Sequence, residues 1–151
     1  MARPLWLALL WAWARAVVGG DDHVTLMAEG QRHADAGRFG RASKAYGRAA
    51  AAAGATDSDR SQALVASSDA LMELGDTERA LDQLRSAITL SNTNIDAHSR
   101  LGQTLADLLD EETGNRREEM LAEATTAFRA LVRLSPDNPS LLSNCGLFFG
   151  Q

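Results

Sequence analysis

One interval recurs along the chain and limits what it can fold into. A small residue is followed by an alanine after 12 residues in two places, and after 22 in a third, where ten residues are inserted. The step from an alanine to the next small residue is 22 residues, except for one step of 26. The underlying unit is therefore 34 residues long, which is the length of a repeated pair of elements. The paired positions are Gly30 and Ala42, Ser68 and Ala80, and Gly102 and Ala124.

Each alanine of these pairs begins an apolar stripe with the period of a helix. A large apolar residue follows four positions later and another apolar residue three positions after that, which places all three on one helix face. Gly37 and Gly75 precede two of the stripes, and glycine after a helix supplies the left-handed cap that ends it. Residues 5–135 contain no proline. We therefore expect helix pairs at 22–36 and 39–54, 59–74 and 77–90, and 95–111 and 116–134, with a last helix from about 139.

Two turn segments carry a family resemblance. Residues 71–80 have the sequence LMELGDTERA, and residues 36–42 have the sequence AGRFGRA. Both resemble the tetratricopeptide repeat (TPR) family, whose period is 34 residues. The ten-residue insert departs from the family pattern, and so does the absence of the first-helix tryptophan. The positions of that tryptophan are occupied here by Leu26, Leu64, His98 and Leu142.

The resemblance implies an all-α, TPR-like solenoid in which antiparallel helix pairs stack into a right-handed superhelix. Three repeats are expected within residues 22–138, at about 23–56, 61–94 and 95–138, with the insert near 107–117. Residues 139–151 then form either a capping helix or a truncated fourth repeat. This segment is apolar, with Leu147, Phe148 and Phe149, whereas a terminal repeat normally carries a polar outer face.

Residues 1–20 differ from the rest of the chain. Arg3 gives a positive start, residues 5–14 form an unbroken apolar run, and residues 14–16 (ARA) offer a cleavage site. This is the three-part layout of a secretory signal peptide. The run is shorter than the roughly 20 apolar residues that span a bilayer. We expect a secreted or lumenal protein, with an uncleaved membrane anchor or an organelle transit peptide as the alternatives.

The composition argues against nucleic acid binding, metal binding and catalysis. The chain carries 15 Lys and Arg against 20 Asp and Glu, whereas phosphate binding needs clustered cations. No phosphate-cradling loop, zinc-protease motif or nucleophile elbow occurs. The histidines are far apart, and the single cysteine, Cys145, is expected to be a small core residue rather than a reactive thiol. We predict a protein that is not an enzyme and needs no cofactor or metal.

The family resemblance also implies a concave groove, lined mainly by the first helix of each pair. Some relatives capture a peptide's terminal carboxylate there with Lys, Asn and Arg residues, and at the matching positions of this chain only Arg100 fits. Asp69 and Asp96 would repel an acidic tail, so we expect a protein or peptide partner with an apolar or basic segment. The alternative role of these charges is to solvate an exposed face. The predicted groove residues are Met27, Gln31, Val65, Asp69, Met72, Asp96, Arg100 and Gln103.

Three hypotheses for the function follow from these features. The favoured one is a non-catalytic scaffold for protein–protein interaction. The second is the N-terminal TPR arm of a larger lumenal enzyme, glycosyltransferase-like or hydroxylase-like, of which this chain is a part. The third is a structural oligomer that self-associates through the last helix.

Overall fold

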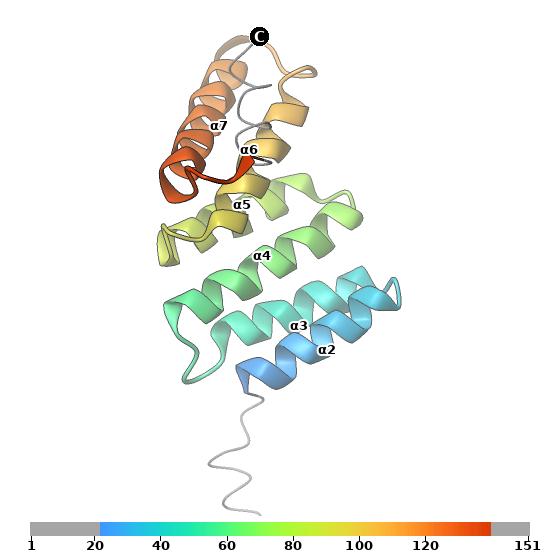
Figure 1. Ribbon diagram of the computed structural model, residues 1–151. Helices are drawn as coiled ribbons and strands as arrows, with labels where there is room; N and C mark the ends of the chain where they lie inside the picture. The colour runs from blue at the N-terminus through green and yellow to red at the C-terminus, as the bar shows by residue number, and fades with distance from the viewer. Residues whose placement is uncertain (1–21, 140–151) are drawn as a thin grey trace, which may run out of the picture.

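The computed structural model describes residues 22–139, which form six α-helices and no strand. The helices form three antiparallel pairs, and the pairs stack in chain order (Figure 1). The predicted all-α solenoid is confirmed, and each helix end lies within three residues of its predicted position. The predicted segments 1–20 and 139–151, except residue 139, lie outside the described residues. The helices are α2 (His23–Asp35), α3 (Phe39–Ala51), α4 (Asp57–Glu73), α5 (Thr77–Leu90), α6 (Ile95–Leu108) and α7 (Gly114–Leu134).

Side-chain caps start the helices of the second pair. Thr56 and Asp59 form a capping box at the start of α4, in which each side chain accepts a hydrogen bond from the other's backbone N–H. Thr56 is therefore the N-cap residue of α4. Asp76 caps α5, because its carboxylate accepts a hydrogen bond from the Arg79 backbone N–H one turn later.

Glycine turns join the two helices of the first and second pairs. Gly37 has φ 67° and Gly75 has φ 75°, a left-handed backbone conformation in which a side chain would be strained. Each glycine lies two residues after the last residue of the first helix of its pair, where the sequence predicts the end of that helix.

The recurring small residue lies where the two helices of a pair cross. A Cβ atom added at Gly30 would overlap the ring of Tyr46, and one added at Gly102 would lie 3.0 Å from the ring of Phe128. Ser68 holds the same place in the second pair and is fully buried. The fixed interval in the sequence therefore marks a close helix crossing in the first and third pairs and a buried small residue at the same place in the second.

Most of the ten-residue insert lengthens the last described helix. α7 has 21 residues, whereas α3 has 13 and α5 has 14. Ala80 and Ala124 occupy equivalent positions in the second and third repeats. α5 starts three residues before Ala80, whereas α7 starts ten residues before Ala124. The seven added residues amount to about two helical turns at the start of α7.

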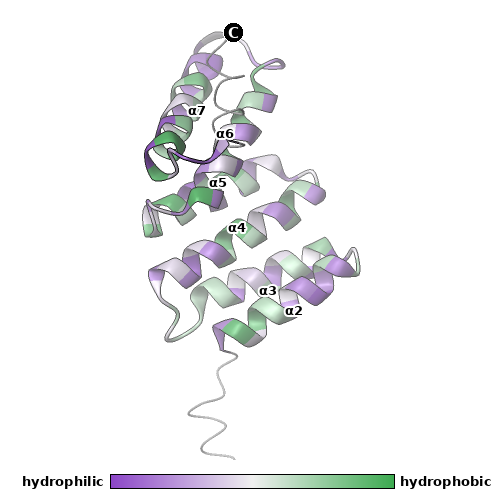
Figure 2. Ribbon diagram, in the orientation of Figure 1, coloured by the Kyte–Doolittle hydropathy of each residue, from purple (hydrophilic) through white to green (hydrophobic). Residues whose placement is uncertain are grey.

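The apolar core changes in composition along the stack. Figure 2 shows hydrophobic and hydrophilic residues interspersed along each helix, as expected for helices with one buried face. Alanine dominates the core of the first pair and its contact with the second, as in the cluster of Leu26 with Ala49, Ala52 and Ala63. A larger cluster joins the second and third pairs. Its bulkiest members are Leu81, Leu84, Leu101, Leu105, Phe128 and Leu131.

Candidate functional site

A pocket of about 420 Å³ opens between the first helices of the second and third pairs. We call it the α4–α6 pocket. Four of the eight predicted groove residues line it, and the remaining lining residues come from the same two helices and from one leucine of α5. Its residues are Ser68, Asp69, Met72 and Glu73 of α4, Leu84 of α5, and Arg100, Gln103, Thr104 and Asp107 of α6.

An ion pair crosses this pocket from α4 to α6. Arg100 Nη1 lies 2.6 Å from Asp69 Oδ1, and the two side chains are 47% and 41% exposed. The pKa of the Asp69 carboxyl is nevertheless raised, chiefly because burial disfavours its charged form, with a further contribution from the Asp96 and Glu73 carboxylates. Arg100 acts in the opposite direction. The pocket therefore holds a carboxylate that its one cation does not fully compensate.

Negative charge predominates around the α4–α6 pocket. Asp69, Glu73 and Asp107 face a single cation, Arg100, which leaves an excess of two negative charges when all four groups are ionised. Glu73 and Asp107 are missing from the predicted groove residues. They lie one helical turn beyond Asp69 and Gln103, so continuing the same helix face by four residues would have identified both.

The other four predicted groove residues do not line the pocket. Met27 is half-buried and packs against the core of the first pair. Gln31 accepts a hydrogen bond from the Tyr46 hydroxyl at 3.3 Å, so it is tied to its own pair. Val65 is only 7% exposed and packs in the core between the second and third pairs, where it is unavailable to a ligand. Asp96 is exposed in the first turn of α6.

No group of three or more His, Cys, Asp or Glu side chains within residues 22–139 is placed to hold a metal ion. His23 Nδ1 lies 3.1 Å from the Ala49 carbonyl oxygen, and His33 Nε2 lies 3.8 Å from a Glu29 carboxylate oxygen. None of the described helices is long and apolar enough to cross a membrane. Cys145 lies outside the described residues.

Comparison with known proteins agrees with this architecture. Residues 69–108, which include the end of α4 and all of α5 and α6, match the family model described as "TPR repeat". Comparison with curated proteins gives no significant match.

Solved TPR domains share the fold over most of the chain. The first TPR of Spaghetti (RPAP3), bound to the HSP90 peptide SRMEEVD, is 16% identical with a TM-score of 0.64, and the match covers 85% of this chain and 93% of that one. The second TPR domain of human RPAP3, in complex with the HSP70 peptide SGPTIEEVD, is 20% identical with a TM-score of 0.63 and coverages of 85% and 95%. The Arabidopsis OM64 TPR domain is 18% identical with a TM-score of 0.64 and the same coverages. Residues 69–108 thus carry a tetratricopeptide repeat, and the three stacked helix pairs of the described chain have the fold of a TPR domain.

Proposed function

We propose that the chain is a non-catalytic interaction module that binds an apolar or basic peptide segment in the α4–α6 pocket. The observation that carries the proposal is the pocket itself, which combines the exposed apolar side chain of Met72 with an excess of carboxylates. A lysine or arginine of the segment would compete with Arg100 for Asp69 and would add contacts to the other two carboxylates.

Two of the structural neighbours provide a contrast in charge. The RPAP3 domains are described as bound to peptides that end in EEVD, which are acidic at their C-terminal ends. An acidic end placed in the α4–α6 pocket would meet Asp69, Glu73 and Asp107, and like charges at close range oppose binding. The chain therefore shares a fold with these domains and is expected to select the opposite charge.

Selection from a display library of random heptapeptides tests this charge preference. We expect the purified chain to enrich peptides with Lys or Arg beside apolar residues, and the affinity of the enriched peptides can be measured by fluorescence anisotropy. The double variant Asp69→Asn and Asp107→Asn removes the excess negative charge, so it should weaken these peptides on the order of tenfold.

The matched control is the double variant Asp57→Asn and Asp137→Asn, which makes the same charge change at two exposed residues outside the pocket. It should leave the affinity within about twofold, because neither side chain lines the pocket and salt screens exposed charges. Enrichment of peptides with acidic ends, or equal losses in the two double variants, would refute the proposal.

The proposal places the protein in the secretory pathway, secreted or lumenal, and this part is supported by residues 1–20 alone. The comparisons give no support to the enzyme-arm hypothesis, since the neighbours described above are TPR domains. Self-association through the segment that starts at 139 stays a prediction.

A further inference from the structure

A second hollow surface lies on the other side of the stack, between the second helices α5 and α7. It consists of two adjoining hollows of about 370 and 360 Å³ that share His98 and Thr126. Each is near the lower end of the size range of small-ligand pockets. We call the combined surface the outer groove. Its apolar lining residues are Ile88, Leu101, Ala122, Ala127, Ala130 and Leu134.

His98 is the polar residue at the centre of the outer groove. Its side chain is nine-tenths buried, with the residue only 7% exposed, and its Nε2 lies 3.0 Å from the Asn92 carbonyl oxygen. A carbonyl oxygen can only accept, so Nε2 carries the hydrogen and Nδ1 of the neutral ring is left as an acceptor. Nδ1 is buried and has no hydrogen-bond partner among the described residues. A buried acceptor without a donor is costly, and a ligand that brings a donor would relieve that cost.

The other repeats show that a histidine is not needed here for packing. Leu26 and Leu64 occupy the equivalent position in the first and second repeats, at the same distance before the alanine of the second helix once the insert is allowed for. An apolar residue thus meets the packing requirement in two repeats, and the third repeat alone places a polar ring there. This departure from the repeat pattern coincides with the two hollows.

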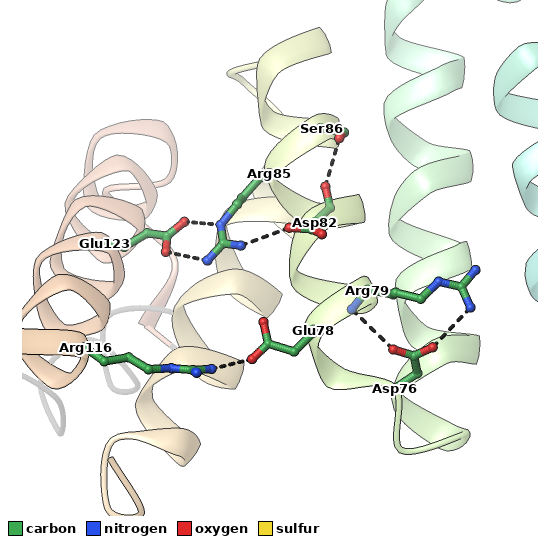
Figure 3. Close-up of polar contacts among 8 residues, drawn as sticks. All are labelled: Asp76, Glu78, Arg79, Asp82, Arg85, Ser86, Arg116 and Glu123. Carbon is green, nitrogen blue, oxygen red and sulfur yellow. Dashed lines mark hydrogen bonds and ion pairs between the residues drawn. The ribbon is translucent and has the colours of Figure 1, made fainter. Parts of the chain in front are cut away.

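Charge at the ends of the outer groove indicates what else the ligand carries. At the α5 end, the Arg85 guanidinium donates two hydrogen bonds to the Glu123 carboxylate, at 2.8 and 2.9 Å, and a third to Asp82 (Figure 3). At the α7 end, Arg133 lines the groove and forms no ion pair within the described residues. The charge still open to a ligand in this part of the chain is therefore positive.

We propose that the outer groove binds a partner segment that presents an aromatic side chain with a hydrogen-bond donor next to a carboxylate. The ring lies on the apolar floor, and the side chains that cover His98 Nδ1 shift on binding so that this atom accepts a hydrogen bond from the phenol O–H or indole N–H. The carboxylate pairs with Arg133. This site is separate from the α4–α6 pocket in position and in charge, so neither proposal depends on the other.

Three small probes test the two polar contacts separately, by chemical-shift titration of the isotope-labelled full chain. Phloretate carries a phenol and a carboxylate, hydrocinnamate lacks the phenolic hydroxyl, and phloretamide replaces the carboxylate with an amide. We expect phloretate to shift the signals of the outer-groove residues in a saturable way. Loss of the hydroxyl should raise Kd about fivefold, and loss of the carboxylate about threefold.

Two variants assign these losses to their residues. His98→Leu copies the residue of the other two repeats, and it should abolish the difference between phloretate and hydrocinnamate. Arg133→Gln, at an exposed position, should abolish the difference between phloretate and phloretamide, and it keeps the proposal testable if His98→Leu does not fold. Asp69→Asn, in the α4–α6 pocket, should leave all three affinities unchanged.

Several outcomes would overturn the proposal. One is the absence of saturable shifts in the outer groove, which would also result if another segment of the chain already covers it. A second is binding that is insensitive to both variants. A third is a dimer in sedimentation experiments that His98→Leu converts to a monomer, because the groove would then hold a second copy of the chain.

Discussion

The contact between the first and second helix pairs and the contact between the second and third pairs are built differently. At the first contact, α3 and α4 meet through alanines, among them Ala42, Ala49, Ala63 and Ala70, and through a hydrogen bond of 3.1 Å between the Ser43 and Ser67 hydroxyls. At the second contact, α5 and α6 meet through leucines and lie together less extensively than α3 and α4 do. Small side chains let backbones approach closely, whereas large ones hold them apart.

The looser contact is also the one that carries the candidate sites. The α4–α6 pocket lies on one side of it and the outer groove on the other. Ion pairs bridge both sides, from Asp69 to Arg100 in the pocket and from Arg85 to Glu123 between α5 and α7 (Figure 3). The comparison indicates that binding surface arises in this chain where bulky residues and charges replace alanine between neighbouring repeats.

The largest expected effect comes from emptying the leucine-rich contact. Leu84 is 1% exposed and lies in the core cluster that joins the second and third pairs. Leu84→Ala should lower the free energy of unfolding by about 2–5 kcal/mol, measured by urea denaturation. Leu90→Ala, at an exposed position in the same helix, should change it by less than about 0.5 kcal/mol. Equal losses would show that the contact is not the stabilising element described above.

The second test adds a methyl group where helices approach most closely. Gly30→Ala would push a methyl group into the Tyr46 ring, so it should destabilise the protein by about 1–3 kcal/mol. Gly47→Ala adds the same group within α3 where no other atom lies within 4 Å, and it should stabilise by about 0.5–1 kcal/mol. The sign of the change in melting temperature distinguishes the two. A stabilising Gly30→Ala would mean that the crossing can widen without cost.

The third test concerns the charges that bridge the second contact. A double-mutant cycle with Arg85→Gln and Glu123→Gln should give a coupling of about 0.2–1 kcal/mol, as for other exposed pairs with good geometry. The coupling should shrink as salt is raised, because added ions screen exposed charges. A parallel cycle with Ser43→Ala and Ser67→Ala, at the first contact, should give a coupling that does not respond to salt. A salt-independent Arg85–Glu123 coupling would contradict this distinction.

The smallest expected effect is the pH dependence contributed by Asp69. Its pKa is raised in the folded protein above the ordinary value of 3.8, so the folded state binds the proton more tightly than the unfolded state does. The contribution of Asp69 to stability is therefore greatest at and below that ordinary value, and it is lost as the pH rises through the raised pKa. The melting temperature of wild type relative to Asp69→Asn should accordingly fall as the pH rises over this range. If the difference in melting temperature stays constant or increases with pH, the pKa of Asp69 is not raised in the folded protein.

The helices were predictable because the relevant interactions are local or recur with a fixed spacing. The interval that begins at Gly30 reflects one steric requirement, and Gly75 ends its helix through its own backbone conformation. Val65 was assigned to the groove because of its position in the repeat. The repeat pattern does not show that α4 packs against α3, α5 and α6. These contacts bury more than one face of the helix, and Val65 with it.

The partners across the second contact were harder to predict from the sequence. Arg85 and Glu123 are 38 residues apart, and so are Glu78 and Arg116, which is one repeat plus four residues. The sequence shows that α5 has an acidic residue before a basic one, whereas α7 has a basic residue before an acidic one. Whether these charges face each other depends on how the insert is divided between loop and helix, which the sequence pattern does not determine.

The two added turns at the start of α7 have a consequence for the shape of the stack. Arg116 lies in these turns and forms an ion pair with Glu78 in the first turn of α5, so a residue beyond the usual repeat length reaches back one full repeat (Figure 3). The curvature of a solenoid is the sum of small rotations between successive repeats. An ion pair at this distance from the helix crossing opposes rotation of the third repeat relative to the second. The insert thus supplies a second exposed ion pair, besides that of Arg85 and Glu123, which favours one rotation of the third repeat relative to the second.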